Sequence, residues 1–340
     1  MIIFYSGNPT GNCELLNKPE DINNSIMLTF ALQTKQVSKR FRKYYKMRKK
    51  KIGIIESHFL DSGAFSQWTK AQEYAKQVGR GRWAYFFTKE FWDYVDAYAE
   101  FVKKYKIAID LYANVDVIGS PQLTWRNQKY LETKHNLHPV PVVHYKTDLK
   151  WLEKYMKKGY EIIGLGGLVG STAKAACRHW LDNCFNIVCD TPNRMPKVKI
   201  HGFGVTSYKF LTRYPWWSVD SAAWDKIASY GGICVPHKRQ GEFVFDIPPY
   251  IMKVSKESPH ASTKSHLLTI STQEKTIIQE WLDFIKIPMG EIDKKGDEIT
   301  EGVVTFHVYR RIANLVFYDM MVKSLPKWPW PFGVRRKTLL

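Results

Sequence analysis

Residues 140–170 read VPVVHYKTDLKWLEKYMKKGYEIIGLGGLVG and hold a complete unit of strand, helix and strand. Val140–His144 and Glu161–Leu165 are short apolar runs without polar alternation, which is typical of strands buried on both faces. Leu149–Lys158 between them has the apolar spacing of an amphipathic helix. Two such strands joined by a helix predict a parallel pair.

The same pattern extends through the first two-thirds of the 340 residues. Further helices are expected at Lys89–Tyr105 and Thr172–Asn183. The other expected strands are Ile2–Tyr5, Ile26–Phe30, His58–Leu60, Ile107–Val115, Lys199–Gly202 and Trp217–Val219. Eight such strands favour an α/β fold of the closed (β/α)8 TIM-like barrel type, which needs roughly 250 residues. A doubly wound open sheet is the alternative, although neither GxGxxG nor GxxxxGK[ST] occurs to support nucleotide binding.

The chain is predicted to divide near residue 250. Residues 1–250 form the expected catalytic barrel, and residues 251–340 form a loop followed by a helical C-terminal addition. Its helices are expected at Thr272–Ile285, where Ser271 and Glu274 have capping-box spacing, and at Thr300–Lys323.

The net charge of +19 predicts a polyanionic partner, either nucleic acid or an anionic membrane surface. Residues 35–51, KQVSKRFRKYYKMRKKK, supply ten of these charges and contain three aromatic residues. Cations with interleaved rings suit phosphates and bases, whereas a solvated basic face is the plainer alternative. The expected nucleic-acid contacts in this basic insertion are Arg40, Arg42, Lys43, Lys46, Arg48 and Lys49.

Membrane and metal interpretations have less support. No apolar run approaches the ~18 residues of a bilayer span, and MIIFYSGNPTGN lacks the features of a signal peptide. Five cysteines form no disulfide framework, which favours a reducing, cytoplasmic location. Cys177, Cys184 and Cys189 have no familiar zinc spacing, although His179 leaves a minor metal option. We therefore expect no metal and no cofactor.

Four segments combine a strand-like run with small residues and a polar group: LDSGAFS (60–66), GLGGLVG (164–170), HGFGVTS (201–207) and WWSVDSAAW (216–224). In a barrel the carboxyl ends of the strands build the active site. Asp61 and Asp220 then form a pair of carboxylates suited to a glycosidic-bond reaction, with one as nucleophile and the other as proton carrier. Taken singly, Asp61 could be a helix cap and Asp220 a salt-bridge partner.

Taken together and in this order, the four segments resemble the tRNA-guanine transglycosylase superfamily. That family has a DSGG-aromatic motif, a GGL-x-G loop, a G-x-G turn and a later aspartate. The resemblance covers roughly residues 55–245. It is closest to the DpdA-type phage branch, which places 7-deazaguanine bases into DNA. If a phage encodes the chain, the expected compartment is the host cytoplasm.

The resemblance implies roles for individual residues. Asp220 matches the nucleophile that bonds to the sugar C1′, and Asp61 matches the general acid/base. Phe65 matches an aromatic that stacks on the base, and the Gly166-Gly167-Leu168 backbone matches the segment that reads its carbonyl edge. The other implied substrate-binding residues are Ser62, Asn114, Asp116, His144, His201 and Gly202.

Some of these positions stay open or depart from the family. Asn114 competes with Asp116 for the base-reading role. His144 replaces a frequent Gln and His201 a frequent Met, so the identity of the incoming base stays open. After Asp220 the chain has only Cys234, so the family's C-x-C-x-x-C…H zinc subdomain is missing.

The expected activity is therefore that of a glycosyltransferase that exchanges guanine in a nucleic acid for a free 7-deazaguanine base such as preQ0 or preQ1. The missing zinc motif and the basic insertion favour DNA over tRNA. The same exchange on tRNA, a DNA glycosylase or hydrolase, and a non-catalytic nucleic-acid-binding barrel are the alternatives. The oligomeric state stays open.

Overall fold

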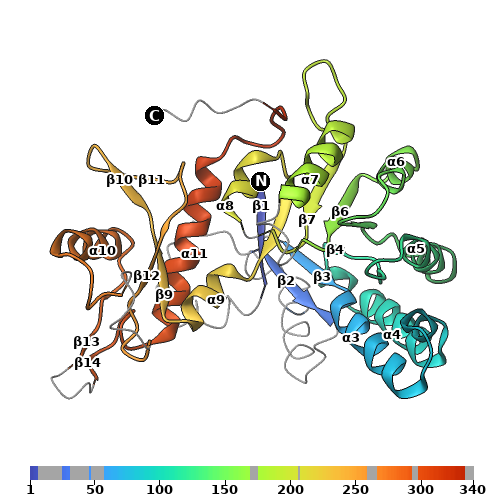
Figure 1. The fold of residues 1–340 in the computed structure, drawn as a ribbon, viewed down its shortest axis with the longest axis horizontal. Helices are drawn as coiled ribbons and strands as arrows, with labels where there is room; N and C mark the ends of the chain where they lie inside the picture. Colours follow the sequence, from blue (N-terminus) through green and yellow to red (C-terminus); the bar gives the residue numbers. More distant parts are fainter. Residues whose placement is uncertain are drawn as a thin grey trace.

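The computed structural model of the chain describes residues 1–6, 25–30, 46, 57–168, 175–205, 207–258, 266–292 and 298–333. Within these residues eight strands form one sheet, in the order β4-β3-β2-β1-β8-β7-β6-β5, and every neighbouring pair is parallel (Figure 1). The strands are β1 (Ile2–Ser6), β2 (Ile26–Thr29), β3 (His58–Asp61), β4 (Leu111–Tyr112), β5 (Val142–His144), β6 (Ile162–Gly166), β7 (Lys199–Gly202) and β8 (Ser218–Ser221).

The two outermost strands are linked through the residues that flank them. Ala113, directly after β4, forms a parallel bridge with Val140, two residues before β5. The Asn114 N–H donates to the Val140 carbonyl at 2.9 Å, and the Val140 N–H donates to the Tyr112 carbonyl at 2.8 Å. Backbone hydrogen bonds therefore join both edges of the sheet.

Alternate residues of the strands point to opposite faces of the sheet. On one face Phe4, Met27, Phe59, Ala113 and Val140 form a buried cluster. On the other face the strands pack against helices in the two larger clusters, to which Ile3, Leu60 and Ile163 belong. Residues that lie two positions after Phe4 or Phe59 therefore point to the same face of the sheet as these rings.

Helices follow most of the strands and pack on the face opposite the Phe4 cluster; Figure 1 shows α3 to α7 beside the sheet. Thr88 caps α4 by accepting a hydrogen bond from the Phe91 N–H, and Ser120 caps α5 in the same way, ahead of a proline at the first helical position. The helices are α3 (Ala64–Val78), α4 (Lys89–Lys104), α5 (Pro121–His135), α6 (Lys150–Lys157), α7 (Ala175–Val188), α8 (Tyr208–Arg213) and α9 (Ala223–Ser229), with the 3-10 helices η2 (Arg82–Phe87) and η3 (Lys106–Ala108).

All eight expected strands are present, but one is much shorter than its sequence pattern. The run Ile107–Val115 was expected to be a strand throughout, whereas η3 occupies its start and β4 contains only two residues, Leu111–Tyr112. The Ala108 N–H bonds to the Tyr105 carbonyl at 2.7 Å, so a tight turn uses the backbone groups that a longer strand would pair. Apolar character alone did not distinguish a tight turn from a strand.

A smaller C-terminal part follows the parallel sheet. Its strands are β9 (Gly232–Val235), β10 (His237–Arg239), β11 (Glu242–Val244), β12 (Tyr250–Lys253), β13 (Glu291–Ile292) and β14 (Glu298–Thr300), and its helices are α10 (Thr272–Phe284) and α11 (His307–Ser324). The expected boundary at residue 250 falls at the start of β12, which pairs antiparallel with β9. The addition therefore contains strands as well as the expected helices.

Helix α11 begins later than the expected start at Thr300. Thr300 ends β14, and the backbone of Gly302 lies against Met289 and Gly290 so closely that a Cβ atom would be 2.1 Å from the Gly290 nitrogen. This crossing leaves no room for a helical turn there. The helix then packs on α9, β9 and β1, and buried Asn314 accepts from the Cys234 N–H at 2.7 Å.

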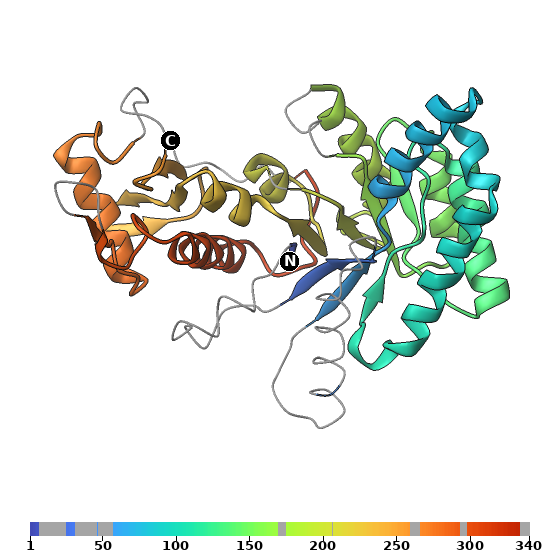
Figure 2. The same cartoon turned by 90° about the horizontal axis from the view of Figure 1, so that it is seen from below.

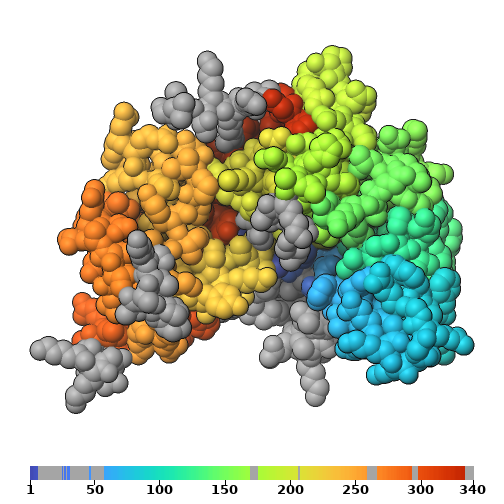
Figure 3. Space-filling model, in the orientation of Figure 1, coloured from blue at the N-terminus to red at the C-terminus, as the bar shows by residue number. Residues whose placement is uncertain are grey.

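The C-terminal part lies to one side of the parallel sheet (Figure 2). In Figure 3 this part (orange) and the segment of α3 and α4 (blue to cyan) lie at opposite ends of the molecule. Among the described residues, no helix is long and apolar enough to cross a membrane.

Candidate active site

Three aspartates lie at the carboxyl ends of the parallel strands. Asp61 is the last residue of β3, Asp220 is the third of the four residues of β8, and Asp116 follows β4 by four residues. Asp61 and Asp220 are separated by two positions from Phe59 and Ser218, so strand alternation turns them to the same face as those residues. Both Asp116 and Asp220 raise the pKa of Asp61 through their charges, which shows that the three carboxyl groups share one region.

Asp220 is held by two donors, one at the end of β1 and one in the turn after β7. The Gly204 N–H donates to Oδ1 at 2.7 Å, and the Ser6 hydroxyl donates to Oδ2 at 3.1 Å. Gly204 has a φ of 66°, a conformation that suits glycine and turns its N–H towards the carboxylate. The side chain is 12% exposed, so two hydrogen bonds hold it while part of it stays accessible.

Asp61 is a carboxyl group with altered acidity. Burial, together with the negative charge of Asp116 and, more weakly, that of Asp220, raises its pKa to about 7. Hydrogen bonds from the Thr29 side chain and the Gly63 backbone act in the opposite direction but are outweighed. Asp61 is therefore close to half protonated at neutral pH, which suits a group that both gives and takes a proton.

Asp116 and His144 form a buried pair. His144 Nε2 lies 2.7 Å from Asp116 Oδ2, and each residue is 5% exposed. A Cβ atom on Gly166 would lie 3.1 Å from His144 Cδ2, so the glycine leaves the space that the imidazole fills. Sequence reasoning placed these two residues in the pocket separately, and the structure brings them together.

His201 lies beside Asp220 in an apolar setting. Its ring is 4.6 Å from that of Phe59 and 4.5 Å from that of Phe203, between centroids. Its Nδ1 is 2.8 Å from the Ser218 hydroxyl, and its Nε2 is 3.6 Å from Asp220 Oδ1, which is longer than a hydrogen bond. Burial lowers the pKa of His201, although Asp220 opposes the shift, so a neutral imidazole is favoured next to the carboxylate.

The remaining expected site residues divide into exposed and structural positions. Phe65, in the first turn of α3, is 73% exposed and free to contact a ligand. The Leu168 side chain belongs to the core, so only its backbone can face a substrate. Asn114 donates to the Thr124 carbonyl at 2.9 Å and so ties the end of β4 to α5.

Ser62 is fully buried, and its hydroxyl has no hydrogen-bond partner among the described residues. Tyr94 donates to its carbonyl oxygen from the neighbouring helix α4. Gly202 packs too closely on Val205 and Trp216 to carry a side chain, because a Cβ atom would lie 2.7 Å from Val205 Cγ2. Gly202 therefore faces the helix-packed core, on the opposite side of β7 from His201.

Several expected positions lie outside the described residues. Arg40, Arg42, Lys43, Arg48 and Lys49 of the basic insertion fall there, whereas Lys46 is described and is exposed on a helix. Val169 and Gly170, which complete the GLGGLVG segment, are also outside.

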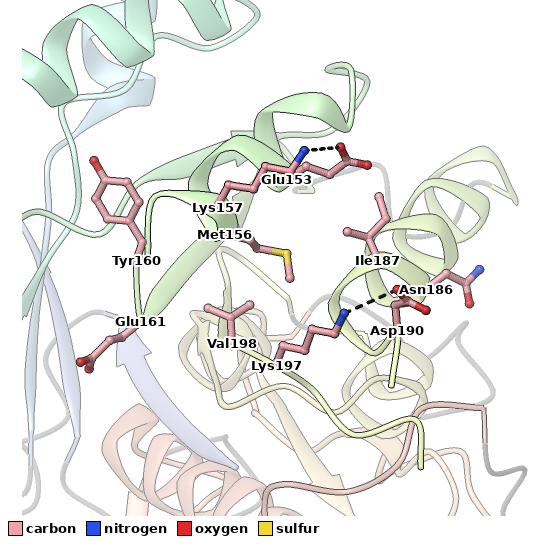
Figure 4. Close-up of a pocket in the computed structure, with 11 residues that line it drawn as sticks. Glu153, Met156, Lys157, Tyr160, Glu161, Asn186, Ile187, Asp190, Lys197 and Val198 are labelled. Atoms are coloured by element: carbon pink, nitrogen blue, oxygen red, sulfur yellow. Dashed lines mark hydrogen bonds and ion pairs between the residues drawn. The ribbon is translucent and has the colours of Figure 1, made fainter. Parts of the chain in front are cut away.

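A cavity of about 860 Å³ lies at the opposite ends of β6 and β7, between α6 and α7 (Figure 4). Its lining includes Glu161 and Val198, which directly precede those strands. Lys157 and Lys197 pair there with Glu153 and Asp190 at 4.0 and 3.5 Å. The cavity is thus separated from the aspartates by the length of the strands, and both of its lysines are paired with acids.

The four cysteines of the described residues occupy core positions. Cys177, Cys184 and Cys189 are buried, and burial raises the pKa of the Cys189 thiol to about 12. His179 is exposed and lies 3.2 Å from Asn183, on a different side of α7 from buried Cys177. In the described part of the chain no group of three His, Cys, Asp or Glu residues could hold a metal ion.

Sequence reasoning missed the residues that orient the carboxylates. Ser6 and Thr29 are hydroxyl residues at the ends of largely apolar strands, and Gly204 was noted only as part of a glycine turn. Their positions at strand ends were the available signal.

Neither a protein-family model nor a curated protein matches this chain.

Proposed function

We propose that this protein exchanges guanine in DNA for a free 7-deazaguanine base through a covalent aspartyl-sugar intermediate. One observation carries the proposal: a buried, doubly hydrogen-bonded carboxylate, Asp220, lies in the same region as Asp61, whose pKa is raised to about 7. A fixed nucleophile beside a group that exchanges protons near neutral pH suits a two-step displacement at a sugar carbon.

The scaffold of this proposal is a closed (β/α)8 barrel. The bridge between Ala113 and Val140, which links the two sheet edges, supports closure. In such barrels the loops at the carboxyl ends of the strands form the active site. Asp61, Asp116 and Asp220 lie at those ends, which agrees with a site at the mouth.

In the first step an Asp220 oxygen attacks C1′ as the bond from C1′ to guanine N9 breaks. The guanine takes the proton of Asp61 as it leaves, and the sugar stays bonded to Asp220. In the second step Asp61 removes the N9 proton of the incoming base, and that nitrogen attacks C1′ and releases Asp220. One proton leaves Asp61 and one returns, so the cycle needs no added acid or oxidant.

The base would be held by groups of matching polarity. The Asp116 carboxylate accepts hydrogen bonds and suits the N–H edge of a purine, while its pairing with His144 fixes its position. The backbone of Gly166 and Gly167 suits the carbonyl edge. Exposed Phe65 offers a ring for stacking on the heterocycle.

DNA is favoured over tRNA by composition. The net charge of +19 and the basic insertion suit phosphates, and the zinc motif of the tRNA enzymes is missing from the sequence. A guanine within a duplex hides its glycosidic bond, so the target nucleotide must be unpaired or flipped.

The test is incubation of the purified chain with DNA or tRNA and radiolabelled guanine or a 7-deazaguanine. We expect DNA to gain label while its strands stay intact, and we expect denaturing electrophoresis to trap a protein–DNA adduct. Label in tRNA alone would transfer the reaction to RNA. Abasic sites without label would indicate a hydrolase, and no change in either polymer would overturn the proposal.

A further inference from the structure

Beyond the carboxylates, α3, η2 and α5 carry a stacked set of aromatic and arginine side chains. The Arg82 guanidinium lies 4.5 Å from the Trp68 ring and 4.8 Å from the Trp83 ring, and the two indoles are 5.7 Å apart. The Arg126 guanidinium lies 4.7 Å from both the Phe87 and Trp92 rings. We call Trp68, Arg82, Trp83, Phe87 and Arg126 the aromatic–arginine surface.

This surface is open to a partner. Phe87 is 64% exposed, Arg82 is exposed, and no described residue forms an ion pair with Arg82. Residues 64–87 contain four Lys or Arg and a single acid, Glu73. A groove of about 600 Å³ beside Trp83 is lined by Lys76 and Arg82. The cation beside Phe87 is Arg126, which donates to the Phe86 carbonyl at 2.9 Å and forms no ion pair with a described residue. Exposed rings beside arginines that have no acidic partner suit an anionic partner with flat groups.

The surface also adjoins the candidate active site. Helix α3 starts three residues after Asp61, and Phe65 in its first turn is one helical turn from Trp68. On the other side, Trp83 Cη2 is 3.5 Å from the position of a Cβ atom on Gly119, three residues after Asp116. Both loops that carry these aspartates therefore border the aromatic–arginine surface, at the end of the molecule away from the C-terminal part (Figure 3).

We propose that the aromatic–arginine surface binds unpaired nucleotides of a nucleic-acid strand next to the nucleotide that enters the site. Exposed rings and guanidinium planes stack on bases only where the bases are unpaired, and arginine also pairs with phosphate. The placement beside the reacting nucleotide rests on the proposed function, whereas the binding itself does not. A strand held here would have its neighbouring bases unstacked, which assists flipping.

The experiment measures binding by fluorescence anisotropy, with a labelled single-stranded DNA, the RNA of the same sequence and the matching DNA duplex. Phe87→Ala should weaken single-strand binding about five- to a hundred-fold, as expected for one lost stacking contact, and should weaken duplex binding less. Phe87→Tyr keeps the ring and should restore affinity. Arg82→Gln should lower the salt slope by about 0.7 for a single strand.

Matched controls lie in the C-terminal part. Phe284 is 56% exposed and Arg239 pairs with Asp246 at 3.1 Å, so Phe284→Ala and Arg239→Gln remove the same groups elsewhere. Both should bind as the wild type does. Circular dichroism melting of each variant checks that the fold is intact.

Wild-type affinity in both Phe87→Ala and Arg82→Gln, or no single-strand binding by the wild type, would overturn the inference. An equal loss on single strand and duplex would overturn the role of unpaired bases. If the variants lose binding and no base exchange is found, the surface stands and the proposed function falls. If exchange occurs and the variants bind as the wild type does, the proposed function stands and the inference about the surface falls.

Discussion

Acidic residues lie at both ends of the parallel strands, but among the described residues the candidate catalytic pair, unlike Glu153 and Asp190, has no lysine partner. At the amino ends of β6 and β7, Glu153 and Asp190 pair with neighbouring lysines in the lining of a solvent-open cavity. At the carboxyl ends, Asp61 and Asp220 have no lysine or arginine partner among the described residues, and hydroxyl, amide and imidazole groups surround them. A carboxylate paired with lysine in water forms an ordinary surface ion pair. A buried carboxylate without a cationic partner, such as Asp61, has an altered pKa, which is typical of functional sites.

The strongest way to break this comparison is to neutralise one carboxylate at each end. Asp220→Asn should reduce base exchange by at least about a thousand-fold, because the amide cannot form the sugar ester. Asp190→Asn, at the other end, should leave exchange unchanged. Labelled-base incorporation measures both, and equal activity of the two variants would contradict the assignment of the nucleophile.

Asp61 gives the next largest effect. Asp61→Asn preserves the shape but cannot carry a proton, and we expect a loss of about a hundred- to ten-thousand-fold in kcat. DNA binding should be kept, since the proposed mechanism places Asp61 against the base and not against the phosphates. An Asp61→Asn protein with normal kcat would show that another group moves the proton.

The electrostatic interaction between Asp116 and Asp61 can be tested through the pH dependence of exchange. The Asp116 charge helps to raise the pKa of Asp61, so Asp116→Asn should lower it. The first step of exchange uses protonated Asp61. In this variant the alkaline decline of kcat should therefore move to lower pH, by about one pH unit. The pH profile of kcat at saturating DNA measures the shift, and an unmoved alkaline limb would rule out the link.

The smallest effect concerns stability. The pKa of Asp61 is about 7 in the folded chain against an ordinary 3.8, so folding binds a proton and the free energy of unfolding falls as pH rises between these values. Asp61→Asn should therefore be more stable than the wild type near pH 8, by between about 1 and 4 kcal/mol, and equal to it near pH 4. Denaturant unfolding at both pH values tests this.

Glu153→Gln is the matched control at the opposite end, because Glu153 faces Lys157 at 4.0 Å in solvent. It should change stability little at either pH, since exposed pairs contribute less than about 1 kcal/mol. A pH-dependent gain in this variant as large as that of Asp61→Asn would remove the distinction between the two ends.

Much of the parallel sheet could be predicted from the sequence. Strands buried on both faces are apolar along most of their length, so a run such as Ile2–Tyr5 carries its own signal. The observed bounds agree within one or two residues for seven of the eight strands. Asp61 and Asp220 were predicted at strand ends for the same reason, because each directly follows or ends such a run. Helices α3 and α5 were not predicted, since their apolar residues do not form a clear stripe.

The tertiary structure decided what the aspartates can do. Ser6 reaches Asp220 across 214 positions of the chain, and His144 meets Asp116 because the residues around β4 and β5 bridge to each other. The raised pKa of Asp61 comes from burial by several strands and from two carboxylates distant in sequence. Hydropathy along the chain determines which segments enter the sheet, but hydrogen bonds and electrostatic interactions depend on distance in space, which only the folded arrangement of strands sets.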